Sequence, residues 1–178
     1  MNTKDLFAKA LIVLLNQYTY KEITITQISQ EANLSRKTFY RTFQDKDELL
    51  QYIFTSIYQQ YESEIIKKKA QHYWDVMQCY FDFWESHKNI LDLFKNSDLL
   101  PLFFDGAYHY SFQIFEYIRS KEVSEYLSNE LPYLLAYSVG GIHSLLIKWV
   151  EDDMKMDSKI IINRLKKGFK SLEIEIAN

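Results

Sequence analysis

Apolar residues recur at intervals of three and four positions along most of the chain, and this spacing is typical of amphipathic helices. The 178 residues include only four Gly and two Pro, so long stretches lack turn signals. The pattern predicts an all-α fold, with helices over residues 3–18, 24–33, 36–43, 46–66, 71–85, 88–95, 99–119, 131–151 and from 157 or 158 onward. This length allows one or two small domains with a sizeable core.

Residues 23–50 hold the densest set of local signals. Thr24 and Gln27 have the spacing of a capping box, which predicts the start of a short helix. Asn33 tolerates the left-handed backbone that a sharp turn requires, so this helix should stop there. Ser35 can cap a second short helix. Two short helices joined by a tight turn describe a helix-turn-helix.

The second short helix has an apolar and a polar side. Phe39 and Phe43, four positions apart, would anchor it to the core. Asp45 and Glu48 form a second possible capping box at the start of a long helix. The remaining faces of the short helix carry Arg36, Lys37, Thr38, Tyr40 and Arg41. A basic outer face on such a helix favours DNA binding over a purely structural helical hairpin.

Residues 24–49 resemble the DNA-binding signature of TetR-type transcriptional regulators, with ISQEANLSRKTFYRTF and DKDEL aligned without gaps. The sequence departs from the family at Asn33, where the family usually has Gly, and at Lys37, where Gly is common. The resemblance implies base contacts by Arg36 and Lys37, and phosphate contacts by Lys46 and others. Arg41 is either a contact or an ordinary solvated arginine. The full implied DNA-binding set is Thr24, Ser35, Arg36, Lys37, Thr38, Tyr40, Arg41, Thr42 and Lys46.

Net charge alone would not indicate a nucleic-acid partner. The chain carries −3 overall, and residues 1–50 hold seven Lys and Arg against six Asp and Glu. The prediction of DNA binding therefore rests on where the cations lie. The single Cys79 excludes an intramolecular disulfide and favours a cytoplasmic protein. Asp5 and Lys9 interrupt the first apolar stretch, which argues against a signal peptide.

We expect a helix-turn-helix domain over residues 1–48, joined by a long helix to a helical effector-binding and dimerisation domain over residues 49–178. Residues 131–147 lack Asp, Glu, Lys and Arg, but they fall short of the roughly 20 residues that span a bilayer. We therefore expect no membrane partner.

Residues 51–118 hold 18 of the 29 aromatic residues, which suggests a pocket lined by flat rings. Ordinary core packing is the alternative for each ring. Satisfied or exposed side chains are likewise the simple interpretation of the four histidines. His109 and His143 fall in helices expected to flank a pocket. The candidate pocket residues are Trp74, Phe81, Trp84, Phe104, Tyr108, His109 and His143.

In TetR-type regulators the last two long helices pair with their copies in a two-fold four-helix bundle. The resemblance therefore implies a homodimer. The candidate interface residues are Leu134, Ser138, Ile142, Leu145, Trp149, Ile161, Leu165 and Phe169. The stretch GGIHSLLIKWVEDDM also resembles the C-terminal domain of a branch of small Firmicute-type regulators, one type of which activates dihydroxyacetone kinase genes.

No catalytic set is recognisable, since the chain has neither a Gly-rich phosphate loop nor a GxSxG motif. No cofactor is implied. A zinc or copper site that includes Cys79 lacks the usual ligand spacing, so we expect no metal.

The leading hypothesis is a homodimeric regulator that binds a pseudo-palindromic DNA operator and responds to a small-molecule effector. The alternative is a ligand- or protein-binding co-regulator whose helix-turn-helix acts through a partner. An enzyme is poorly supported.

Overall fold

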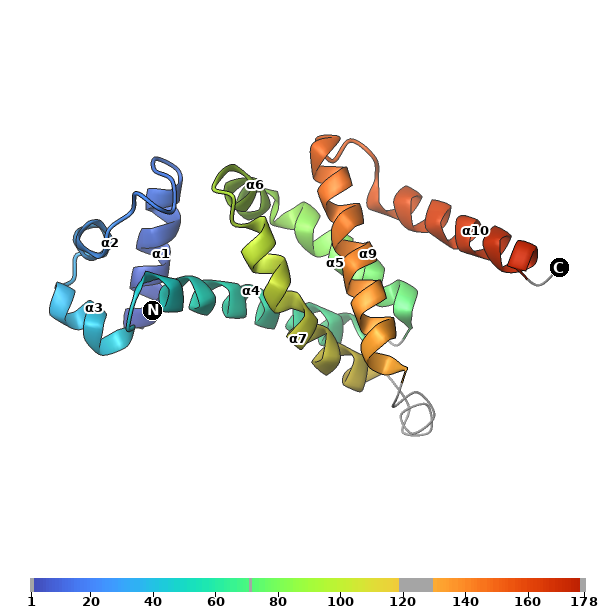
Figure 1. Ribbon diagram of the computed structural model, residues 1–178, viewed down its shortest axis with the longest axis horizontal. Coiled ribbons are helices and arrows are strands. Elements are labelled where there is room, and N and C mark those ends of the chain that lie inside the picture. The colour runs from blue at the N-terminus through green and yellow to red at the C-terminus, as the bar shows by residue number, and fades with distance from the viewer. Residues whose placement is uncertain (1, 71, 119–129, 177–178) are drawn as a thin grey trace. The chain divides into compact units, whose positions relative to one another are not determined.

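The computed structural model describes residues 2–70, 72–118 and 130–176, and every regular element within them is a helix (Figure 1). This confirms the predicted all-α fold. The helices are α1 (Thr3–Leu15), α2 (Ile25–Glu31), α3 (Arg36–Thr42), α4 (Lys46–Lys68), α5 (Tyr73–Ser86), α6 (Lys88–Asn96), α7 (Leu100–Ile118), α9 (Leu131–Glu151) and α10 (Ser158–Ile176). None of the helices in the described ranges is long and apolar enough to cross a membrane.

The chain divides into two compact units. Unit 1 comprises Met1–Gln60 with Asn89–Phe103, and unit 2 comprises Tyr61–Lys88 with Phe104–Asn178. Helices α4 and α7 each contribute to both units. This division differs from the predicted domains 1–48 and 49–178, which stay a prediction.

Unit 1 is organised around aromatic rings that hold the three N-terminal helices together. The fully buried ring of Phe7 on α1 meets the ring of Phe39 on α3 edge-on, with centroids 5.1 Å apart. The centroid of the Phe43 ring lies 6.3 Å from that of Phe7. Helix α1 contacts both α2 and α3 (Figure 1). Because α2 and α3 have only seven residues each, this packing is what stabilises them.

The local signals for these short helices are confirmed. Thr24 caps α2 in a complete capping box with Gln27. Ser35 caps α3, and its Oγ accepts a hydrogen bond from the Thr38 amide at 3.0 Å. Asn33 has φ 54, as a left-handed turn residue should. At the start of α4 only half of the expected box forms, because the Glu48 carboxylate accepts from the Gln44 amide instead of the Asp45 amide.

Helix α1 is shorter than predicted, since it ends at Leu15 and the predicted helix ran to residue 18. The Asn16 side-chain amide donates to the carbonyl oxygen of Ile12 at 2.8 Å. The Asn16 backbone amide bonds instead to Val13, one position nearer. An Asn side chain that competes for a helical carbonyl in this way is a common reason for a helix to end.

Asn33 provides a direct test of the turn between α2 and α3. Asn33→Ala is expected to lower the free energy of unfolding by roughly 1 kcal/mol, because a Cβ-bearing residue without a short polar side chain is strained at positive φ. Asn33→Gly should be neutral or slightly stabilising. Urea unfolding followed by circular dichroism measures both, with Glu31→Ala on α2 as the control. An Asn33→Ala variant as stable as the wild type would contradict this description of the turn.

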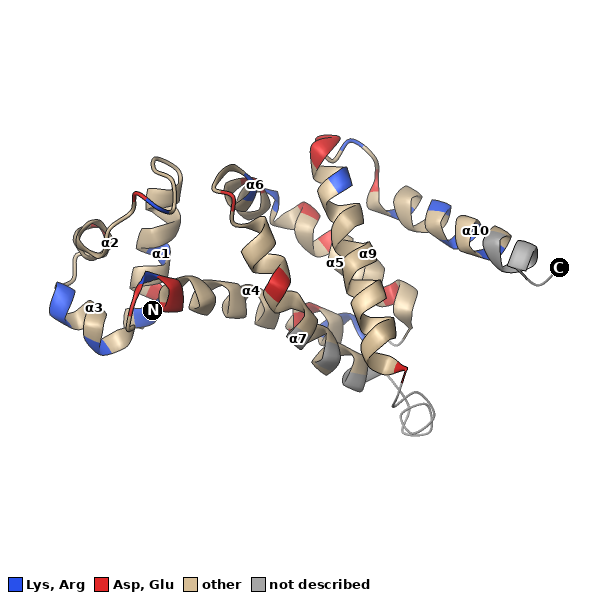
Figure 2. Cartoon of the chain, viewed as in Figure 1, with Lys and Arg blue, Asp and Glu red and all other residues tan. Residues whose placement is uncertain are grey.

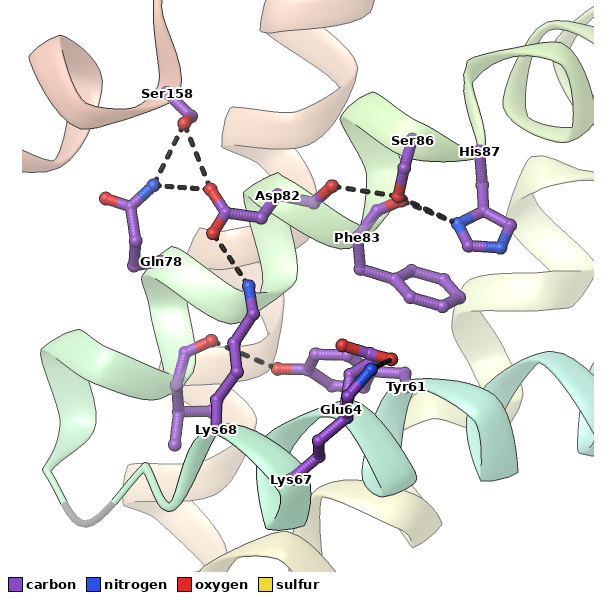
Figure 3. A network of polar contacts seen from close by, with 11 residues as sticks. Tyr61, Glu64, Lys67, Lys68, Gln78, Asp82, Phe83, Ser86, His87 and Ser158 are labelled. Carbon is purple, nitrogen blue, oxygen red and sulfur yellow. Dashed lines mark hydrogen bonds and ion pairs between the residues drawn. The ribbon is translucent and has the colours of Figure 1, made fainter.

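In unit 2, a polar network joins the end of α4, helix α5 and the start of α10 (Figure 3). The Asp82 carboxylate on α5 accepts hydrogen bonds from Lys68 Nζ at 2.8 Å and Gln78 Nε2 at 2.7 Å. Ser158, the buried first residue of α10, donates to the same carboxylate at 3.4 Å. Burial raises the pKa of Asp82, but these hydrogen bonds outweigh it and leave the pKa below its usual value. The network fixes where α10 begins.

The turn between α9 and α10 is fixed by Trp149. Its indole is 3% exposed, packs on the Phe81 ring at 5.3 Å and donates from Nε1 to the carbonyl oxygen of Met156 at 2.7 Å. Asp153 and Met154 both have positive φ and reverse the chain between the two helices. The buried contacts of Trp149 therefore determine how α9 and the turn to α10 pack within unit 2.

Candidate nucleic-acid interface and effector site

Helix α3 presents a compact basic surface. It carries three cations and no acidic residue, whereas carboxylates gather at the start of α4 (Figure 2). Arg36, Lys37 and Arg41 are exposed, and Tyr40 is 51% exposed. The Arg36 guanidinium carbon lies 6.0 Å from the centre of the Tyr40 ring, a cation–π distance that orients the side chain. An exposed, oriented Arg at the start of a short helix suits a bidentate contact with guanine.

The Ser and Thr hydroxyl groups of the predicted DNA-binding set have intramolecular hydrogen bonds. Thr24 Oγ1 donates to Gln27 Oε1 at 2.7 Å, as part of the cap of α2. The hydroxyls of Ser35 and Thr38 bond to each other at 2.9 Å. Thr42 Oγ1 donates to the carbonyl oxygen of Thr38 at 2.8 Å. Thr24 and Ser35 therefore cap α2 and α3, and the hydroxyls of Thr38 and Thr42 bond within or next to α3, the helix that carries Arg36.

Lys46 lies in a different environment from the α3 cations. Its Nζ donates to the carbonyl oxygens of Tyr20 and Ile23, the latter at 2.7 Å. Burial lowers the pKa of this half-buried lysine. These contacts could not be predicted from local sequence patterns, because Lys46 and its partners lie more than 20 positions apart.

The predicted effector-pocket residues fall into two groups. Phe81 and Trp84 are 0% and 2% exposed and pack against neighbouring rings, as core side chains do. Trp74 is half-buried on α5, with its ring 6.0 Å from Phe169 on α10. The side chain of His109 lies outside the described residues.

Phe104, Tyr108 and His143 form the second group. The His143 imidazole on α9 stacks on the Phe104 ring of α7, at 4.2 Å and 18°. The Tyr80 ring lies 6.1 Å from the same imidazole. The exposed Tyr108 donates its hydroxyl to the carbonyl oxygen of Pro132 at 3.1 Å, which ties α7 to α9. The structure thus brings an imidazole into an aromatic cluster of unit 2.

His143 is expected to make the stability of the protein depend on pH. Burial lowers its pKa to about 4, so the unfolded chain takes up this proton first as the pH falls below about 6.5. The wild type should therefore lose up to about 2 kcal/mol between pH 7.5 and pH 5 that His143→Leu does not lose. Urea unfolding at the two pH values measures the difference. An equal loss of stability in the wild type and in His143→Leu would contradict this prediction. His72→Gln, which changes an exposed histidine, serves as the control.

The predicted dimer residues lie in a groove, in the core or at other positions of α9. The groove has a volume of about 380 Å³ and lies along α9 and α10. Trp149 does not contribute to it, because its indole faces Phe81 in the core. Leu134 is 45% exposed, and Ser138 and Ile142 are half-buried on α9. The groove is lined by Leu145, Met156, Ile161, Arg164, Leu165, Gly168 and Phe169.

Sequence reasoning missed another exposed part of α9. Tyr133 is 80% exposed and Tyr137 is 67% exposed, four positions apart on the same helix. Gly140 and Gly141 follow, with open space among the described residues where their side chains would be. The sequence signal for this exposed surface was a pair of tyrosines at helical spacing followed by two glycines.

The described part of the chain holds no group of three or more His, Cys, Asp or Glu arranged to bind a metal ion. Cys79 is buried, and burial raises the pKa of its thiol.

The comparisons with known proteins match both parts of the chain. Residues 8–53 match the family model for bacterial regulatory proteins of the tetR family. Residues 71–171, more than half of the chain, match the model for a transcriptional regulator C-terminal region.

One curated relative is the HTH-type dhaKLM operon transcriptional activator DhaS of Lactococcus lactis subsp. lactis (strain IL1403). It is 34% identical over 71 residues, which are 40% of this chain. The aligned part spans only 36% of that relative's length.

Two solved structures share the fold. A transcriptional regulator (TerR/AcrR family) from Aquifex aeolicus VF5 has a TM-score of 0.60 at 18% identity and covers 96% of this chain and 99% of its own. The fatty acid degradation regulator FadR from Bacillus halodurans has a TM-score of 0.52 at 13% identity, with 94% of each chain covered. Taken with the two family models, these matches show that the chain belongs to the TetR family of transcriptional regulators.

Proposed function

We propose that this TetR-family regulator binds a pseudo-palindromic operator as a homodimer and responds to a small molecule. The observation that carries the DNA part is the exposed, basic α3, with Arg36 oriented by Tyr40 and the helix anchored through Phe39. Two copies of α3 would enter major grooves about 34–36 Å apart. Arg36 and Lys37 would contact base edges, and Tyr40 would contact phosphate.

The homodimer is supported by unfilled apolar surface on α9 and α10. The groove along these helices is lined mostly by apolar side chains, and Phe169 in it is 40% exposed. Tyr133 and Tyr137 extend the exposed surface of α9. A second copy that packs its own α9 and α10 here would bury this surface, and open space at Gly168 allows a helix to come close.

The effector response is supported by the aromatic cluster around His143. A neutral imidazole between rings can donate one hydrogen bond and accept another, while Phe104 and Tyr80 offer flat apolar faces. This chemistry suits a planar or lipophilic ligand with one polar group. Such a ligand would change DNA affinity only to the extent that it binds the two states of the dimer differently.

Selection of genomic fragments by the purified full-length chain at near-physiological salt tests the DNA part. We expect an inverted repeat, recovered by the wild type and lost with Arg36→Ala. Weak binding that ignores sequence and disappears with added salt would instead support a co-regulator that acts through a partner.

A further inference from the structure

The loop before α2 is held to the first turn of α4 by two adjacent side chains. Lys46 Nζ donates to the carbonyl oxygens of Tyr20 and Ile23, and it lies 4.3 Å from the centre of the Tyr20 ring. Asp47 accepts a hydrogen bond from the Tyr20 hydroxyl at 2.5 Å. We refer to the contacts among Tyr20, Ile23, Lys46 and Asp47, all within unit 1, as the α4 clamp.

The environment of Lys46 is poorly suited to a DNA phosphate. Two of the three ammonium hydrogens are used by the carbonyl contacts. Asp45, Asp47 and Glu48 surround the lysine in sequence, and Asp45 already accepts a hydrogen bond from the Glu48 amide at 2.8 Å. The start of α4 thus carries carboxylates where a phosphate-binding helix end would offer free amides.

The clamp acts on the segment that determines where α2 begins. Ile23 is 2% exposed and directly precedes Thr24, which caps α2. Helix α2 in turn contacts α3. We propose that Lys46 and Tyr20 are positioning residues for DNA binding, which hold the loop and α2 so that α3 is presented in its binding orientation. This inference rests on the proposed DNA-binding function.

A positioning residue and a phosphate contact differ in their dependence on salt. Each phosphate that a protein neutralises adds about 0.9 to the slope of log affinity against log salt concentration. Loss of a phosphate contact therefore weakens binding and flattens this slope. Loss of a positioning contact weakens binding and leaves the slope unchanged, because the number of released counterions stays the same.

The test compares Lys46→Met and Tyr20→Phe with the wild type on the selected inverted repeat, between 50 and 200 mM salt. Tyr18→Phe, which removes a hydroxyl from an exposed tyrosine near the same loop, is the matched control. We expect both clamp variants to bind roughly tenfold more weakly with the wild-type slope, since a hydrogen bond to a charged group is lost in each. The control should bind as the wild type does.

A slope that falls by about 1 per protomer in Lys46→Met would overturn the proposal, as would wild-type affinity in Tyr20→Phe. Amide hydrogen exchange of the protein without DNA tests the clamp independently of whether the chain binds DNA. Exchange across residues 19–24 should be faster in both clamp variants than in Tyr18→Phe. If residues 19–24 exchanged at the same rate in the clamp variants and in Tyr18→Phe, the clamp would be refuted. If exchange were faster in the clamp variants but the wild-type chain selected no DNA, only the DNA-binding proposal would be refuted.

Discussion

Replacing Arg36 with alanine is expected to weaken operator binding more than any other single change on α3. A bidentate Arg–guanine contact contributes about 1–3 kcal/mol, and a two-fold complex loses two of them, or about 2–6 kcal/mol. Arg36 is exposed at the start of α3, and the Tyr40 ring limits its freedom before binding. Discrimination at the contacted base pair should fall together with affinity. Fluorescence anisotropy on matched and single-base-changed operators measures both quantities.

Two further variants make this prediction specific. Arg36→Lys keeps the charge but not the planar pair of donors, so it should retain binding to unrelated DNA and lose discrimination. Lys95→Ala removes an exposed cation from α6 and should leave operator affinity unchanged. If Arg36→Ala weakened binding equally on every sequence, Arg36 would be a phosphate contact and the proposed base contact would be wrong.

Placing a carboxylate in the groove of α9 and α10 is expected to separate the dimer. Leu165→Glu would place a carboxylate among the apolar side chains of a two-fold interface in both copies, with Arg164 as the charged residue of the same lining. At a few kcal/mol per copy, the dimer dissociation constant should rise about a thousandfold or more. Sedimentation velocity should then find monomers at concentrations where the wild type is dimeric. The affinity of the variant for the operator should fall sharply.

The same helix offers a matched control. Asn163→Glu introduces the same side chain and charge at an exposed position of α10 that does not line the groove, so this variant should remain dimeric. Circular dichroism of both variants shows whether either has lost its helices. A folded Leu165→Glu chain that remains a dimer and binds the operator normally would place the interface elsewhere.

The parts of the fold that depend on neighbouring residues were predictable. The capping box of Thr24 and Gln27, the cap at Ser35 and the turn at Asn33 each depend on residues within four positions of one another. Such signals can be recognised in the sequence because each hydrogen bond joins residues that are close together in the chain. Helix α3 could therefore be located, and its exposed residues identified, from sequence.

Contacts over longer separations were not predictable. Periodicity placed Trp149 on an apolar stripe of α9, but not whether that stripe faces the core or a second copy. The indole packs on Phe81 and donates to the carbonyl oxygen of Met156, and this hydrogen bond forms only once the α9–α10 turn closes. The place of Lys46 in the motif implies a phosphate contact, which stays a prediction, but no local pattern indicated its carbonyl partners 23 and 26 positions away.

The most direct test of the central claim is the stoichiometry and symmetry of one protein–operator complex. Native mass spectrometry of the selected fragment should show two chains per site. Scrambling either half-site should remove most of the affinity, because both copies of α3 bind in successive major grooves. One chain per fragment, with affinity unaffected when one half-site is scrambled, would contradict the homodimeric mechanism.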